Sequence, residues 1–123
     1  MEFFATANKQ IEADALQTRL DIASLPKFCA SISRLLSHAD DQGEIYCVWG
    51  EFTVHRELIR GGVRFTLPQC LNTIAWTITT GLPPEPEKII IHCTINRRDH
   101  DADFVSTLEE FVENWRTGLE ALL

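Results

Sequence analysis

Positively charged residues are few in this sequence. Its 123 residues include 11 lysines and arginines against 18 aspartates and glutamates, which gives a formal net charge of -7 at pH 7. This excess of negative charge repels phosphate groups at long range, so neither duplex nucleic acid nor a membrane is an expected partner. No run of about 18 apolar residues could span a bilayer, and residues 1–6 lack the basic start and apolar run of a signal peptide. These absences predict a cytoplasmic protein.

The sequence also lacks the common catalytic and cofactor motifs. It has no G-x-S-x-G elbow, no Walker loop and no dinucleotide-binding glycine pattern, since Gly61-Gly62 lies inside an expected strand. Four cysteines that never form a C-x-x-C pair predict free thiols rather than a zinc knuckle or a redox couple: Cys29, Cys47, Cys70 and Cys93. Four histidines are too scattered for three-ligand metal spacing: His38, His55, His92 and His100. We therefore predict no cofactor and find no catalytic signature.

The composition is that of an ordinary globular protein, with 45% hydrophobic and 24% charged residues. We expect one α+β domain that spans residues 1–123. In its N-terminal part, Asn8 to Asp21 shows helical spacing of apolar residues and predicts an amphipathic helix. Pro26 suits the first turn of a second helix, which the pattern extends to Ala39, and Gly43 suits the exit from that helix.

Residues 44–96 hold four short segments in which apolar residues alternate with other residues, a pattern typical of strands. The expected strands cover residues 44–54, 59–67, 73–79 and 88–97. If Arg56 and Glu57 form the first turn, the expected cross-strand pairs are Val48 with Phe65, Tyr46 with Leu67, and Trp49 with Arg64. The apolar residues of all four strands then share one face, which predicts a four-stranded antiparallel β-meander.

The last helix has the clearest periodicity in the chain. Its apolar stripe consists of Phe104, Leu108, Phe111, Val112, Trp115, Leu119 and Leu122. We expect this helix to lie across the apolar face of the sheet. The predicted order is α-α-β-β-β-β-α, which is an α+β fold with N-terminal helices and a C-terminal helix packed on one face.

The other face of the predicted sheet is the candidate binding surface. It is expected to carry Trp49, Glu51, Arg60, Arg64, Thr77, Thr79 and His92. The guanidinium of Arg64 could stack on the ring of Trp49, and two arginines could hold a carboxylate or a phosphate. Cys47 on this face is a conceivable nucleophile, although nothing near it in sequence indicates a lowered thiol pKa. A solvated face without a binding role explains the same residues.

Acidic residues at Asp99, Asp101 and Asp103, followed by Glu110, resemble the ligand spacing of a calcium loop. The position that needs glycine is Phe104, and a strand rather than a helix precedes the segment. Capping of the last helix by Asp101 or Asp103 explains these carboxylates better, so we predict no metal site.

These patterns favour a small accessory protein that uses its exposed sheet face to contact a protein partner or a second copy of itself. The alternative is a protein that binds a small anion, or a modest enzyme, with arginine and histidine side chains on the same face. Single-stranded nucleic acid on the sheet would need more aromatic residues and fewer acidic ones.

Overall fold

The computed structural model describes residues 1–96 and 100–123. The chain begins with strand β1 (Glu2–Ala7), helix α1 (Ala13–Arg19), the 3-10 turn η1 (Ile22–Ser24) and helix α2 (Leu25–Phe28). Six strands follow: β2 (Ile32–Ala39), β3 (Gln42–Cys47), β4 (Gly50–Ile59), β5 (Gly62–Thr66), β6 (Ala75–Thr80) and β7 (Ile89–Thr94). Helix α3 (Ala102–Leu122) comes last. None of the helices in these two ranges is long and apolar enough to cross a bilayer.

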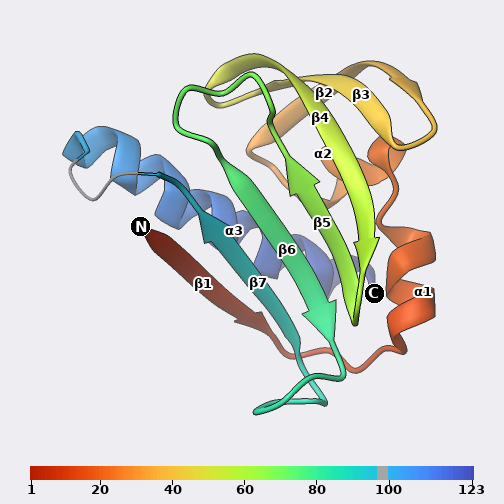
Figure 1. The fold of residues 1–123 in the computed structure, drawn as a ribbon. Coiled ribbons are helices and arrows are strands. Elements are labelled where there is room, and N and C mark those ends of the chain that lie inside the picture. The colour runs from red at the N-terminus through yellow and green to blue at the C-terminus, as the bar shows by residue number, and fades with distance from the viewer. Residues whose placement is uncertain (97–99) are drawn as a thin grey trace.

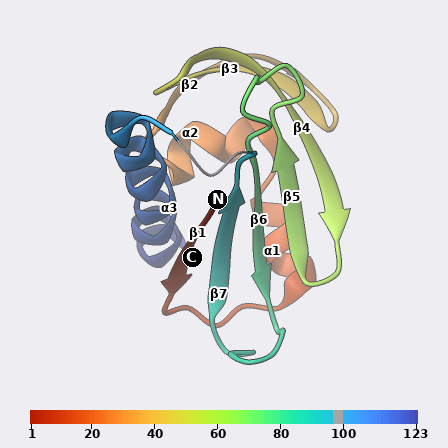
Figure 2. The same ribbon diagram turned by 60° about the vertical axis from the view of Figure 1, so that its left-hand side comes forward.

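The strands form one seven-stranded antiparallel sheet in the order β1-β7-β6-β5-β4-β3-β2 (Figure 1). Strands β2 to β7 pair in sequence order, and β1 joins the far edge beside β7. Helix α3 lies along one side of this sheet, with α1 and α2 on that same side (Figure 2). The buried apolar side chains of the three helices and of the strands form one core between these two layers. We call the opposite side of the sheet the open face.

The structure confirms an α+β protein with an antiparallel sheet, but the predicted four-stranded meander is wrong because the sheet has seven strands. In the N-terminal part only Ala13–Arg19 of the first predicted helix is helical, and Glu2–Ala7 forms an edge strand. The second predicted helix ends at Phe28, after which Ile32–Ala39 pairs with β3. Its apolar residues have helical spacing, yet pairing with a neighbouring strand outweighs that local pattern.

Residues 44–54 form a hairpin rather than one strand. Strand β3 ends at Cys47, a tight turn follows, and Gly50 starts β4 with a φ of 114° that favours glycine. The predicted turn at Arg56 and Glu57 is wrong, since both residues lie inside β4. The expected partners change accordingly: Phe65 pairs with Arg56, Arg64 with Glu57, and Tyr46 with Glu51.

The second half of the prediction agrees with the structure. Strands β6 and β7 lie where alternation placed them, and Trp76, Ile78, Ile89, Ile91 and Cys93 point into the core. Helix α3 buries most of its predicted stripe: Leu108, Phe111, Val112, Trp115 and Leu119. These elements were predictable because the apolar residues of each follow a single periodicity that defines one apolar face.

A chain of aromatic rings runs through the core between the sheet and α3. In order, the rings belong to Phe104, Trp49, Phe111, Trp76, Phe65, Trp115 and Phe28, with neighbouring centroids between 4.9 and 6.4 Å apart. The chain starts near the N-terminal end of α3 and finishes at α2. It ties the β3–β4 turn, the centre of the sheet and both helices into one packed unit.

The C-terminal end of α3 is closed by backbone contact. A Cβ atom at Gly118 would lie 1.7 Å from the carbonyl oxygen of Phe28, so only glycine lets α2 and α3 approach this closely. The guanidinium of Arg19 donates to the carbonyl of Leu122 at 2.9 Å, and the ammonium of Lys9 donates to the carbonyl of Leu123 at 2.6 Å. These positive groups donate hydrogen bonds to carbonyls that have no partner within the helix. They also interact favourably with the negative end of the helix dipole.

Candidate functional site

A groove of about 410 Å³ lies at the other end of α3. We call it the apolar groove. Its lining residues come from the β3–β4 turn, β4, the β5–β6 loop and the first turns of α3: Trp49, Phe52, Gln69, Cys70, Leu71, Asn72, Ile74 and Phe104. None of these side chains is charged, and the polar members are two amides and a thiol. The groove is therefore suited to a small neutral molecule with a mostly hydrocarbon surface.

Trp49 is held over the groove by a hydrogen bond and by ring packing. Its indole Nε1 donates to Oγ1 of Thr107 at 2.8 Å, and that hydroxyl donates to the carbonyl of Phe104 at 2.6 Å. The Trp49 ring lies 6.4 Å from the Phe104 ring and 5.0 Å from the Phe111 ring. Trp49 thus has one fixed orientation between the groove and the aromatic core.

The β5–β6 loop forms the outer wall of the groove. Its base is closed by a hydrogen bond of 3.1 Å from the amide of Leu67 to the carbonyl of Ile74, and the amide of Asn96, just after β7, donates to the carbonyl of Asn72 at 3.0 Å. Although these hydrogen bonds hold the loop in place, the Leu71 side chain is 89% exposed. Thr73 has a φ of 52°, a left-handed conformation that strains a β-branched residue by about 1–3 kcal/mol. The loop therefore stores strain while it presents a leucine to solvent.

Two buried hydrogen-bond donors lie unsatisfied in the aromatic core. The indole Nε1 atoms of Trp76 and Trp115 are buried and have no acceptor among the described residues. An unpaired buried donor costs about 1–3 kcal/mol. Trp76 contacts Phe111 edge to face at 4.9 Å, and Phe111 in turn contacts Trp49, so the first of these donors lies two rings inward from the groove.

The predicted binding residues do not lie on one surface. Glu51, Arg64, Thr77, Thr79 and His92 are on the open face, as predicted, from the register of β4 to β7. Arg60 lies in the exposed turn between β4 and β5. Trp49 is on the other side of the sheet, against α3, so the predicted stacking of Trp49 on Arg64 is wrong. The glycine turn at residue 50 reverses the chain and carries Trp49 to the helix side.

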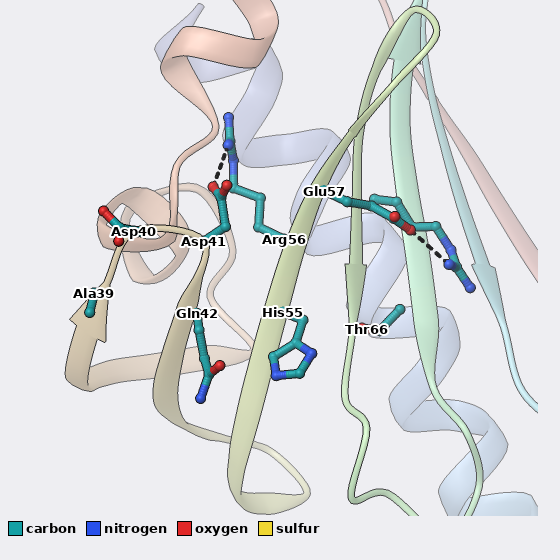
Figure 3. Close-up of a pocket in the computed structure, with 9 residues that line it drawn as sticks. Ala39, Asp40, Asp41, Gln42, His55, Arg56, Glu57 and Thr66 are labelled. Atoms are coloured by element: carbon teal, nitrogen blue, oxygen red, sulfur yellow. Dashed lines mark hydrogen bonds and ion pairs between the residues drawn. The ribbon is translucent and has the colours of Figure 1, made fainter.

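The open face carries a continuous row of side chains across five strands. The row runs from Glu57 through Arg64, Thr77 and His92 to Phe4. Arg64 donates to the carboxylate of Glu57 at 2.8 Å, and the His92 ring stacks on Phe4 with centroids 4.3 Å apart. A second hollow adjoins the Glu57 end of this row (Figure 3).

Burial makes the core thiols poor nucleophiles. It raises the pKa of Cys29 and of Cys93 to about 12 each. Cys47 does not lie on the open face but is buried beneath the sheet, and desolvation raises its pKa too. The predicted free thiols are confirmed, since all four cysteines are unpaired.

The acidic segment before α3 caps the helix. Oδ1 of Asp101 accepts a hydrogen bond of 2.7 Å from the amide of Asp103, so Asp101 is the N-cap and the capping prediction is confirmed. Asp99, the third carboxylate of the predicted pattern, lies outside the described residues. Within residues 1–96 and 100–123, no group of His, Cys, Asp and Glu side chains is arranged to hold a metal ion.

The sequence interpretation missed Phe52, Gln69, Leu71 and Phe104 as members of one site. They come from three separate segments, and only the closure of the sheet against α3 brings them together. One signal was present: Leu71 is an apolar residue inside a turn-forming segment that reads Pro-Gln-Cys-Leu-Asn. Turn chemistry does not favour an apolar residue at a loop tip, so its presence there can indicate a binding role.

The sequence matches no protein-family profile and no curated protein. Among solved structures, the chain is similar to a START superfamily protein from Mycobacterium smegmatis, with a TM-score of 0.64 and 11% sequence identity. The match covers 98% of this chain and 94% of that protein. At this identity the similarity shows the fold alone: a START-like, helix-grip arrangement in which an antiparallel sheet packs against a C-terminal helix.

Proposed function

We propose that this protein binds a small, uncharged and largely apolar molecule in the apolar groove. The observation that carries the proposal is a groove with aromatic walls and no charged lining residue, flanked by a leucine that is 89% exposed. The similarity to a START superfamily protein supports it, because that fold suggests ligand binding. The sequence favoured contact with a protein partner or a second copy and gave binding of a small anion as the alternative. The present proposal keeps small-molecule binding from that alternative, but it changes the ligand from an anion to a neutral molecule and moves the site from the open face to the helix side.

The chemistry of the lining defines the expected ligand. Trp49, Phe52 and Phe104 offer flat apolar surfaces, while the amides of Gln69 and Asn72 can each donate to or accept from one polar group. A charged group would lose its hydration without gaining a counter-ion, which costs several kcal/mol. An alcohol, a ketone or an amide with a hydrocarbon body therefore fits better than a carboxylate.

Leu71 is expected to make the largest single contribution to the free energy of ligand binding. A nearly fully exposed leucine gains about 1.5–3 kcal/mol when it is transferred from water to an apolar contact. Its loop is already anchored by backbone hydrogen bonds, so little conformational entropy is lost when a ligand covers the leucine. A protein partner on the open face stays a prediction from the sequence.

The test compares 1-octanol with octanoate, which differ in charge but share a hydrocarbon body. We expect isothermal titration calorimetry to detect 1-octanol binding at least tenfold tighter than octanoate. Leu71→Ser is expected to weaken 1-octanol binding about tenfold while leaving thermal stability nearly unchanged. Leu58→Ser is the matched control, since Leu58 is also exposed but lies outside the groove. Equal binding of both probes, or equal effects of both variants, would contradict the proposal.

A further inference from the structure

The open face carries a second hollow of about 540 Å³, formed where the β2–β3 turn rises beside β4 and β5 (Figure 3). We call it the polar cavity. Its lining is unlike that of the apolar groove, because it contains charged side chains of both signs together with neutral polar groups. It shares no residue with the apolar groove, so it is a separate site.

Three polar side chains, an amide, an imidazole and a hydroxyl, cross the cavity in one row. Gln42 of β3 pairs in register with His55 of β4, and His55 pairs with Thr66 of β5. Figure 3 shows the Gln42 and His55 side chains extending side by side from adjacent strands. None of these three side chains has a hydrogen-bond partner within residues 1–96 and 100–123. The row therefore offers an amide, an imidazole and a hydroxyl that are ready to bind a polar molecule.

Two ion pairs flank this row, and they differ in how firmly they are held. Arg56 is 11% exposed, and it donates to Asp41 at 2.8 Å and also to the carbonyls of Leu20 and Gln17. The Arg56 guanidinium therefore already has three acceptors within the protein. Arg64 is 46% exposed and has one partner, Glu57, which is itself 56% exposed. An exposed pair of this kind is worth about 0–1 kcal/mol, so a ligand can exchange with it at low cost.

The charges of the lining restrict the ligand. Three carboxylates, of Asp40, Asp41 and Glu57, face two guanidinium groups, and the whole chain carries a net charge of -7 with histidine neutral. A simple anion would meet more negative than positive charge, and a simple cation would meet Arg64. A molecule with both an ammonium and a carboxylate can pair with Glu57 and Arg64 at once, since each has free hydrogen-bonding capacity.

We propose that the polar cavity binds a small zwitterion, such as a free amino acid or an unblocked short peptide. The ligand carboxylate pairs with Arg64, the ligand ammonium pairs with Glu57, and the remaining polar atoms meet Gln42, His55 and Thr66. This site is independent of the apolar groove, so either proposal can fail while the other stands.

The experiment uses unbranched amino acids that separate the two charges by increasing lengths: glycine, β-alanine, γ-aminobutyrate and 5-aminovalerate. Binding is followed by two-dimensional NMR through the backbone amides of Gln42, His55 and Thr66. We expect one member of the series to bind best, because Glu57 and Arg64 lie opposite each other on neighbouring strands, which limits how far apart their charged groups can be. Its N-acetyl derivative, which keeps only the carboxylate, and its amide, which keeps only the ammonium, are each expected to bind at least tenfold more weakly.

Three variants locate the charges. Arg64→Gln and Glu57→Gln are each expected to weaken the best zwitterion at least tenfold. Arg60→Gln, which makes the same charge change as Arg64→Gln but in the neighbouring exposed turn and outside the cavity, is expected to change affinity less than twofold. Binding of the N-acetyl derivative as tight as that of the zwitterion, binding that survives Arg64→Gln, or no shift at the three amides with any member of the series would overturn the proposal.

Discussion

The two ends of α3 are built in opposite ways. At the C-terminal end the backbone of Gly118 lies against the backbone of Phe28, and Arg19 and Lys9 occupy the last carbonyls. At the N-terminal end Phe104 meets Trp49 across a groove, and the neighbouring loop leaves Leu71 in solvent. Both ends rest on the same aromatic chain, so the difference lies in what covers that chain. One end holds the sheet and helix together, and the other leaves room for a ligand.

This comparison separates stability from binding. Substitutions at the closed end are expected to change the free energy of unfolding, and substitutions at the groove are expected to change ligand affinity with little effect on unfolding. A fold with a single, evenly packed core would not divide its residues in this way.

Gly118→Ala is expected to have a large effect on stability. The added Cβ would lie 1.7 Å from the Phe28 carbonyl oxygen, so α2 and α3 must move apart. The expected loss is at least about 2 kcal/mol, which exceeds the gain of about 1 kcal/mol in helix propensity. Thr117→Ala, at the adjacent exposed position, is the control and is expected to be neutral or stabilising. Urea denaturation measures both, and a neutral Gly118→Ala would show that the helices do not touch there.

Arg56→Met is expected to cost about 2–4 kcal/mol, because the carbonyls of Leu20 and Gln17 and the carboxylate of Asp41 all lose a charged donor. Arg64→Met removes the same charge from the open face and breaks only its exposed pair with Glu57. We expect that change to cost less than about 1 kcal/mol. Similar losses for the two variants, measured by urea denaturation, would mean that Arg56 does not pin α1 to the sheet.

The strain in the groove loop is expected to be measurable. Thr73→Asn places a residue that tolerates the left-handed conformation at a φ of 52°, so a gain of about 0.5–1 kcal/mol in unfolding free energy is expected. Thr79→Asn in β6 is the control, and there the loss of a β-branched residue from a strand is expected to destabilise. Thermal unfolding of the pair distinguishes a strained loop from a relaxed one.

Thiol reactivity is expected to follow the same division. Cys70 lies partly exposed at the groove, whereas burial raises the pKa of Cys29 and of Cys93 to about 12. Iodoacetamide under native conditions is therefore expected to modify Cys70 first, and mass spectrometry of peptides identifies the site. If Cys29 or Cys93 were modified before Cys70, the core would have to open readily.

The smallest expected effect is a pH dependence on the exposed side of α3. A hydrogen bond from Arg116 lowers the pKa of Glu113 below its usual value. A carboxylate with a lowered folded pKa stabilises the protein above its unfolded pKa, and this contribution is lost as the pH falls through the folded pKa. Glu113→Gln is therefore expected to flatten the acid limb of the stability curve slightly. Because Glu113 is exposed, solvent screens most of the interaction.

Elements whose position is fixed by their own apolar pattern were predicted correctly, whereas elements that depend on pairing with a distant part of the chain were not. Strands β6 and β7 and helix α3 were predicted correctly because their own apolar periodicity places each of them against the core. Strand β1 was missed because Glu2–Ala7 is short and becomes a strand only by pairing with β7, whose residues lie between 82 (Ala7 with Ile89) and 92 (Glu2 with Thr94) positions later in the sequence. Strand β2 was mistaken for a helix because its apolar residues repeat at helical spacing until β3 pairs with them.

The site was less predictable than the fold. The open-face residues were placed correctly where strand parity decided the side, as for Arg64 and His92. Trp49 was placed on the wrong side because the turn before Gly50 reverses the chain, and strand alternation does not continue through a turn. Leu71 and Phe104 belong to a groove that no single segment encodes.

The most direct measurement follows the three indole N–H signals in NMR spectra during titration with 1-octanol. Trp49 alone lines the groove and donates to Thr107, whereas Trp76 and Trp115 lie deeper in the core. We expect the Trp49 signal to shift first, together with the backbone amides of residues 69–72, and the amides of the polar cavity to stay in place. A Trp49 signal that does not move at saturating 1-octanol, or shifts confined to the open face, would contradict binding in the apolar groove.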